Sequence, residues 1–239
     1  MSAHIELKNP LILALDVDSA EKCFEMVQKL AGHLGAIKIG PRLAVRYGAT
    51  LISEIAKICP VFVDNKYLDI PNTMEAAIRA TFEAGATFAT VHAWSGGEAL
   101  RRLAKVESDL NRIRPFKILN VTVLTSFSEE TLPPGFLAQA LERHVTELAQ
   151  LVLESGLDGI VCSPKEVALI RTLSASAFLV TPGVRMAGDA HGDQKRVETP
   201  EAAMRAGASA LVVGRPIYES KDPIETVERI LSSVRGAKA

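Results

Sequence analysis

The sequence has few cysteines, and none is spaced as in a metal or redox motif. Its 239 residues include only Cys23, Cys59 and Cys162, with no CxxC pair. This pattern argues against a zinc site or a disulfide framework and favours a reducing compartment. An apolar leader segment and an apolar run of membrane-spanning length are also lacking. We therefore expect a cytoplasmic protein with no membrane partner.

An excess of charge of either sign is lacking too. Lysine and arginine total 27 against 28 acidic residues, for a net charge of −1. The chain thus lacks the excess of positive charge that is typical of nucleic-acid-binding proteins. Any anionic ligand must therefore be bound by local hydrogen-bond donors and cations. An early GxGxxG motif and a Pro/Gly/Ser-rich linker are absent. These absences argue against a dinucleotide-binding fold and favour one domain over residues 1–239, with a core of about 11–232.

Short apolar runs recur along the chain, which is 48% hydrophobic. They begin at residues 11, 36, 61, 88, 117, 159, 178 and 210. Segments with apolar residues at helical spacing separate them, and many of these segments close near a glycine. Eight such alternations predict an α/β fold, a (β/α)8 TIM barrel. The connections at 125–137 and 183–200 are longer than needed, and the second is a candidate lid.

Charged side chains gather at the ends of the first three predicted strands. These residues are Asp16, Lys38, Asp64 and Lys66. Strand alternation places Asp64 and Lys66 on one face, and neighbouring strands lie about 4.8 Å apart. The cluster is therefore either a structural set of ion pairs or a charge array at the mouth of the barrel. The following "DIPNT", with Asp69 and Thr73, also has the pattern of a helix start with Asn72 or Thr73 as N-cap.

An anion site is predicted after the last two strands, in "TPGVR" and "VVGRPI". The corresponding loops of barrel enzymes commonly bind phosphate. Gly183 and Gly214 allow close backbone approach, and Arg185 and Arg215 supply cations. A structural turn is the alternative for this pattern.

Other polar residues near strand ends have two interpretations each. Thr125 and Ser126, which are expected to end the fifth strand, either meet a polar ligand or cap the next turn, and Gln194 either meets a ligand or is solvated. His92, with no second histidine at ligand spacing, is more simply a hydrogen-bonded barrel residue than a metal ligand. Trp94 is most simply a packing residue.

The sequence resembles the orotidine 5′-phosphate decarboxylase family. "DNKYLDIPNT" is similar to the family signature D-x-K-x-x-D-I-x-x-T, and "LALDV", "KIG", "TVHA", "VTVLTS", "TPGVR", "GDQKR" and "VVGRPI" follow the order of family segments. The resemblance covers about residues 11–225. It implies a homodimeric lyase of de novo pyrimidine biosynthesis that converts orotidine 5′-monophosphate to UMP with no cofactor and no metal. The "HAWSGG" turn is bulkier than the family pattern.

The resemblance also implies roles for individual residues. Lys66 is the expected proton donor, Lys38 and Asp64 flank the reacting centre, and Asp16 binds the ribose. Asp69, Ile70 and Thr73 are expected to reach the partner's site across the dimer interface. Thr125 and Ser126 are expected to meet the pyrimidine. The residues expected at the phosphate are Arg185, Gln194, Gly214 and Arg215.

Two other functions fit parts of the pattern. A Mg²⁺-dependent sugar-phosphate barrel, such as a keto-gulonate-phosphate decarboxylase or a hexulose-phosphate synthase, shares the Asp-x-Lys-x-x-Asp core. It places an acid near the position that Lys38 occupies, so Lys38 and the "IPNT" continuation favour the metal-free decarboxylase. A catalytically silent scaffold needs no intact Asp–Lys array.

Overall fold

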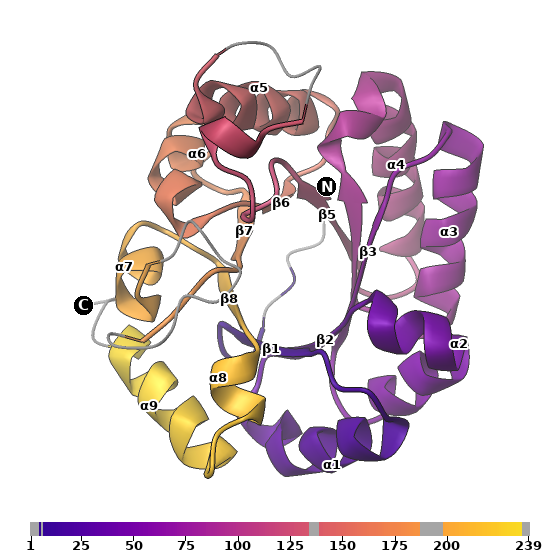
Figure 1. Ribbon diagram of the computed structural model, residues 1–239. Coiled ribbons are helices and arrows are strands. Elements are labelled where there is room, and N and C mark those ends of the chain that lie inside the picture. The colour runs from indigo at the N-terminus through magenta and orange to yellow at the C-terminus, as the bar shows by residue number, and fades with distance from the viewer. Residues whose placement is uncertain (1–4, 6, 134–138, 187–197, 236–239) are drawn as a thin grey trace.

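A closed barrel of parallel strands forms the centre of the molecule (Figure 1). The computed structural model describes residues 5, 7–133, 139–186 and 198–235. Within them the strands are β1 Leu11–Leu15, β2 Ala36–Ile39, β3 Val61–Tyr67, β4 Phe88–His92, β5 Lys117–Val121, β6 Gly159–Val161, β7 Phe178–Thr181 and β8 Ala210–Val213. All eight begin at the residue where a predicted apolar run begins. The predicted (β/α)8 TIM barrel is confirmed.

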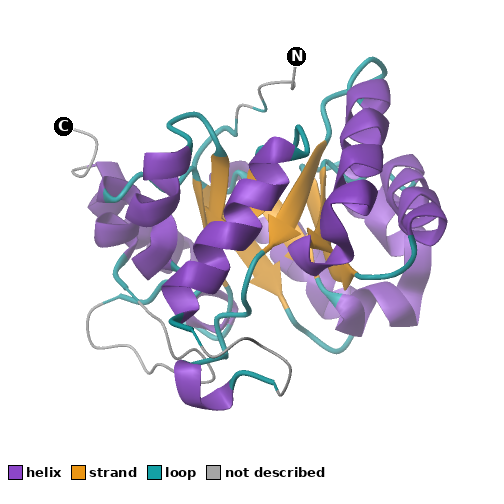
Figure 2. Ribbon diagram, turned by 90° about the horizontal axis from the view of Figure 1, so that it is seen from above, coloured by secondary structure: helices purple, strands orange, loops and turns teal. Residues whose placement is uncertain are grey.

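Helices cover the outside of the barrel (Figure 2). They are α1 Ala20–Leu30, α2 Pro41–Ala56, α3 Pro71–Glu83, α4 Gly96–Leu110, α5 Leu141–Glu154, α6 Val167–Leu173, α7 Pro200–Arg205, α8 Arg215–Tyr218 and α9 Pro223–Arg235. Four 3₁₀ turns complete the described elements: η1 Ala31–His33, η2 Ala93–Ser95, η3 Glu129–Thr131 and η4 Pro164–Glu166. The main hydrophobic core lies between this layer and the outward-facing strand residues, such as Leu13, Ile37 and Val63.

The interior of the barrel has an apolar lower layer. Phe88 packs edge-on against Phe62, with ring centroids 6.1 Å apart, and stacks on Phe178 at 5.8 Å. Because side chains alternate along a strand, the residue two positions after Phe62 also points into the barrel. That residue is Asp64. The polar residues at the C-terminal end of the barrel interior therefore lie directly above this aromatic layer.

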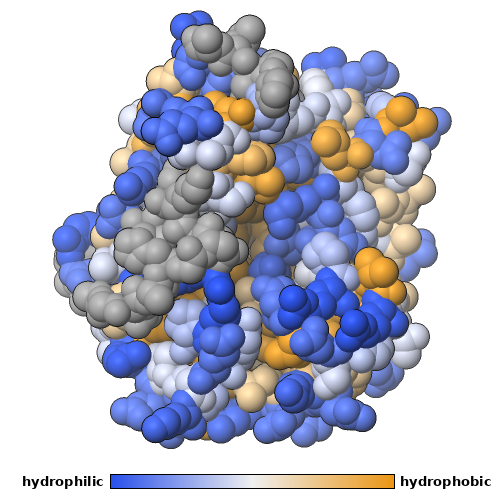
Figure 3. Space-filling model, in the orientation of Figure 1, coloured by the Kyte–Doolittle hydropathy of each residue, from blue (hydrophilic) through white to orange (hydrophobic). Residues whose placement is uncertain are grey.

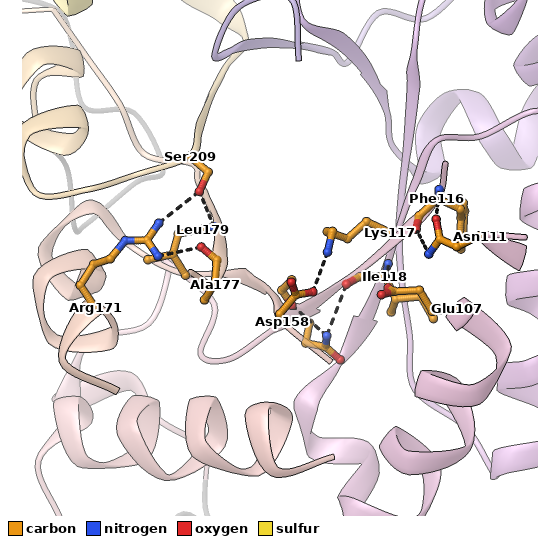
Figure 4. A network of polar contacts seen from close by, with 12 residues as sticks. Glu107, Asn111, Phe116, Lys117, Ile118, Asp158, Arg171, Ala177, Leu179 and Ser209 are labelled. Carbon is orange, nitrogen blue, oxygen red and sulfur yellow. Dashed lines mark hydrogen bonds and ion pairs between the residues drawn. The ribbon is translucent and has the colours of Figure 1, made fainter. Parts of the chain in front are cut away.

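The N-terminal end of the barrel contains a network of polar contacts (Figure 4). Lys117 Nζ donates to Asp158 Oδ1 at 2.6 Å, and Arg171 donates to the carbonyl of Ala177 and to Ser209 Oγ. A pocket of about 1110 Å³ opens among these residues. It lies at the opposite end of the strands from the predicted site. Its principal polar groups bind one another, so we regard this end as structural.

Two local predictions were wrong. Helix α3 begins at Pro71 with Ile70 as N-cap, so neither Asn72 nor Thr73 caps it. Proline at the first helical position shifts the start, since its fixed φ suits that position. Strand β5 ends at Val121, so Thr125 and Ser126 lie in the following loop and do not end the strand.

The three cysteines are buried and form no disulfide. In the described part of the chain, helices fall short of the length and apolarity needed to cross a membrane.

Candidate functional site

A pocket of about 670 Å³ opens at the C-terminal end of the barrel. The space-filling view shows a hollow at the centre of this face (Figure 3). The pocket gathers ten of the predicted residues, which are Asp16, Lys38, Asp64, Lys66, Thr125, Ser126, Gly183, Arg185, Gly214 and Arg215. These residues come from the ends of six strands, β1, β2, β3, β5, β7 and β8, or from the loops that follow them.

Asp64 lies between two ammonium groups. Its Oδ2 accepts a hydrogen bond from Lys38 Nζ at 3.0 Å, and its Oδ1 accepts one from Lys66 Nζ at 2.9 Å. The Asp64 and Lys38 side chains are each 12% exposed, whereas that of Lys66 is 37% exposed. Of these three charged side chains, that of Lys66 is therefore the most accessible.

The alternating charges keep one another ionised. Burial alone raises the pKa of Asp64, but Lys38 and Lys66 outweigh it and lower that pKa to about 2. Burial alone lowers the pKa of Lys38, but Asp64 and then Asp16 outweigh it and the pKa is raised. Asp64 and Lys38 are thus both charged at neutral pH, at a depth where an unpaired ion is costly.

The hydrogen-bonded ladder between β3 and β4 is interrupted at the residues that carry the charge array of Asp64 and Lys66. Val63 pairs with Ala89 and Tyr67 pairs with Val91, so three residues of β3 lie opposite Thr90 alone. Lys66 has φ of 50°, the left-handed region that a side chain other than glycine seldom adopts. A strained backbone of this kind costs on the order of 1–2 kcal/mol. Such strain is often found at functional sites.

Asp16 follows β1 on the other side of Lys38. A Cβ added to Gly40 would stand 3.2 Å from Asp16 Oδ1 and 3.8 Å from Lys38 Nζ. Gly40 therefore leaves room for the carboxylate and the ammonium at the start of α2. Arg42 Nη1 donates to the backbone carbonyl of Asp16 at 3.0 Å.

The wall opposite Lys66 carries the predicted anion site. Gly183 has φ of 80°, which requires glycine or strain, and a Cβ on Gly214 would meet the Ala14 carbonyl oxygen at 3.2 Å. Both glycines line the pocket, so the backbone of both loops lies at its wall. Arg185 and Arg215 line the same pocket.

Three of the predicted residues that the structure describes are not among those that line this pocket. Asp69 and Ile70 on the β3–α3 connection, and Thr73 in the first turn of α3, are exposed, and Asp69 Oδ1 accepts the amide of Ile70 at 2.6 Å. Gln194 lies outside the described residues, as does most of the candidate lid.

Sequence reasoning missed several residues of the site. Arg42 and Tyr218 line the pocket, and Thr90 Oγ1 donates to Asp64 Oδ1 at 2.9 Å. Inward alternation with Phe88 and His92 was the available signal for Thr90. His92 Nδ1 is buried and, in the described part of the chain, has no hydrogen-bond partner. Burial, with Lys66 nearby, lowers the pKa of His92.

Comparison with known proteins connects this geometry to a family. Residues 9–230 match the family described as Orotidine 5'-phosphate decarboxylase / HUMPS. Proteins named "Orotidine 5'-phosphate decarboxylase" from Trichlorobacter lovleyi and Erythrobacter litoralis are 39% and 41% identical, over 96% and 94% of this chain and 96% and 98% of their own lengths. The crystal structure of orotidine 5'-phosphate decarboxylase from Lactobacillus acidophilus has a TM-score of 0.81 and 32% identity, over 95% of this chain and 99% of that one.

Proposed function

Because this chain belongs to the orotidine 5′-phosphate decarboxylase / HUMPS family, we propose that it decarboxylates orotidine 5′-monophosphate to UMP in pyrimidine biosynthesis. The observation that carries the proposal is the carboxylate of Asp64 held between the ammonium groups of Lys38 and Lys66, inside a pocket large enough for a nucleotide.

Lys66 is the catalytic residue in this proposal. When the bond between C6 of the pyrimidine and the carboxylate breaks, CO2 departs and the electron pair stays on C6 in an in-plane orbital. The ring cannot delocalise that pair well, so stabilisation must come from a fixed charge nearby. The Lys66 ammonium supplies that charge and transfers a proton to C6, and the resulting amine regains its proton from solvent.

Asp64 and Lys38 hold Lys66 in place. A carboxylate beside the substrate carboxylate also repels it before reaction, and that repulsion is relieved as CO2 leaves. The buried pair formed by Lys38 and Asp64 keeps this negative charge at a fixed position.

The nucleotide's phosphate provides binding energy away from the reacting bond. Arg185, Gly214 and Arg215 line one side of the pocket, where a guanidinium can bind phosphate through two hydrogen bonds. We propose that Asp16 binds the ribose hydroxyls and that Thr125 and Ser126 contact the pyrimidine. Gln194 is proposed to join the phosphate site. Remote binding energy of this kind offsets the cost of ordering the substrate.

We propose that the enzyme acts as a homodimer. Leu68 and Ile70, on either side of Asp69, are 56% and 65% exposed. Exposed apolar side chains beside a charged site are suited to contact with a second chain. In this arrangement Asp69, Ile70 and Thr73 complete the partner's pocket.

A direct assay tests the proposal. Purified chain, treated with EDTA and then freed of it, is mixed with orotidine 5′-monophosphate, and the ultraviolet absorbance of the pyrimidine is followed. We expect absorbance to fall as UMP and CO2 form in equal amounts. Absence of turnover by folded protein would refute the proposed function.

The same assay addresses the Mg²⁺-dependent alternative. A sugar-phosphate enzyme of this family needs acidic ligands for the ion, whereas Lys38 places a cation among the carboxylates here. Turnover of a sugar phosphate that disappears with EDTA and returns with Mg²⁺ would favour that alternative.

A further inference from the structure

We propose that Thr90 is a positioning residue. Its hydroxyl forms two hydrogen bonds, which hold the Lys66 ammonium in the position from which it donates its proton. The proposal rests on the proposed function, because it concerns the group that donates the proton. Thr90 lies on β4, is completely buried and is not among the residues that line either of the two pockets described above, so it acts through Lys66 and Asp64.

The first argument is the interrupted ladder. Between the pairs Val63–Ala89 and Tyr67–Val91, strand β3 advances four residues while β4 advances two. In a regular parallel ladder, a backbone carbonyl of the neighbouring strand would accept the amide of Lys66. Here Lys66 N donates to Thr90 Oγ1 at 2.9 Å. A side-chain oxygen thus replaces the missing ladder partner of a partly buried amide, which would be costly to leave unpaired.

The second argument is that the Thr90 hydroxyl both accepts and donates a hydrogen bond. Thr90 Oγ1 accepts from Lys66 N and donates to Asp64 Oδ1, each at 2.9 Å. The same carboxylate oxygen accepts Lys66 Nζ. Three contacts therefore form a closed loop from the Lys66 amide through Thr90 and Asp64 to the Lys66 ammonium. The loop fixes both ends of one residue.

The third argument is the backbone of Lys66. Its φ of 50° is unfavourable for a lysine, and it requires compensation from the surroundings. The hydrogen bond from the Lys66 amide to Thr90 is such compensation. Without it, relaxation of the backbone toward an extended conformation would move the ammonium away from Asp64.

These arguments predict different effects for similar substitutions. Thr90→Val keeps the shape and β-branching but removes donor and acceptor, whereas Thr90→Ser keeps the hydroxyl. Thr181→Val is a matched control, because Thr181 is also completely buried on a strand, and its Oγ1 has no hydrogen-bond partner in the described part of the chain.

The experiment measures kcat, KM, UMP affinity and thermal unfolding for the unmodified chain and the three variants. We expect T90V to lose about ten- to a hundredfold in kcat, with KM and the Kd for UMP within about threefold of the unmodified values. T90S should stay within about threefold in kcat, and T181V should match the unmodified enzyme. Equal kcat in T90V and T181V would overturn the proposal, as would equal losses in T90S and T90V or a T90V loss confined to KM.

Crystal structures of T90V and T90S provide a readout independent of turnover and of the proposed function. We expect Lys66 to keep a positive φ in T90S and to lose it in T90V. An unmodified chain that does not decarboxylate orotidine 5′-monophosphate would refute the function, while the Lys66 conformation would still decide the role of Thr90. If T90V does not fold, T90A supplies the hydroxyl deletion for the same comparison, and an unchanged Lys66 φ in either variant would contradict the proposal.

Discussion

Lys38 Nζ lies 3.0 Å from Asp64 Oδ2, and this contact joins two neighbouring strands at the mouth of the barrel. Both side chains are nearly buried, and Asp64 accepts two further hydrogen bonds at its other oxygen. Because every oxygen of the carboxylate is bound, the Asp64 side chain has little freedom to move. The position of Lys66 is therefore set by a rigid neighbour.

Replacing Lys66 by alanine should abolish catalysis without unfolding the chain. Asp64 keeps Lys38 as a partner in this variant, so no buried charge is left unpaired. We expect kcat to fall by more than about a thousandfold, because the proton donor and the stabilising charge are lost together. Steady-state kinetics and circular dichroism measure the two quantities. Lys57→Ala, which removes an exposed lysine directly after α2, is the control, and near-normal turnover in K66A would remove Lys66 from the mechanism.

The charge array also predicts a dependence of stability on pH. The pKa of Asp64 is about 2 in the folded chain, below its ordinary value of 3.8. Its contribution to stability is therefore full above about pH 4 and is lost as the pH falls toward 2. The difference corresponds to about 2 kcal/mol. Denaturant unfolding from pH 6 to pH 2 should show a shallower acid decline for Asp64→Asn than for the unmodified chain.

A surface substitution separates this effect from general acid denaturation. Glu25→Gln removes an exposed carboxylate of α1, and its curve should run parallel to that of the unmodified chain. Parallel curves for D64N and the unmodified chain would contradict the role assigned to the ion pairs.

The sequence predicted much of the fold, because apolar strand runs and helical spacing are local patterns. It also placed Lys38, Asp64 and Lys66 together, since strand alternation and barrel order fix the approximate positions. It did not predict Thr90, whose role depends on pairing between β3 and β4 across an irregular ladder. Alternation alone also gives no sign of the left-handed backbone at Lys66.

Arg215 should affect substrate binding more than chemistry. Replacing it by alanine removes a guanidinium from the pocket wall, and we expect KM for the nucleotide to rise about ten- to a hundredfold with a smaller change in kcat. Inhibition by inorganic phosphate should weaken in parallel. Arg112→Ala, an exposed arginine paired with Asp109, should change neither quantity. An unchanged KM in R215A would count against the phosphate site.

Mixed dimers test whether Asp69 acts across the interface. Asp69→Ala and Lys66→Ala should each be inactive alone. In a mixed dimer, one site carries both defects and the other carries none if Asp69 serves the partner. Random exchange makes half of the dimers mixed, so activity should return to about a quarter of the unmodified level. Mixed dimers shown to form by mass spectrometry but lacking activity would place Asp69 within its own chain's site.

We predict that glycine is needed at position 40 because a side chain there would crowd Asp16, and not because the backbone adopts a conformation that only glycine favours. Its φ of −91° suits any residue, but a Cβ there would stand 3.2 Å from Asp16 Oδ1, closer than ordinary van der Waals contact. Gly40→Ala should therefore displace the Asp16 carboxylate by a few tenths of an ångström. Because Asp16 is proposed to bind the ribose, we expect KM to rise several-fold while the unfolding temperature changes little. Gly32→Ala is the matched control, since a Cβ on Gly32 meets no atom within 4 Å. Steady-state kinetics of the two variants and a crystal structure of G40A test whether crowding of Asp16 weakens substrate binding. Equal KM values for G40A and G32A would show that this crowding has no functional consequence.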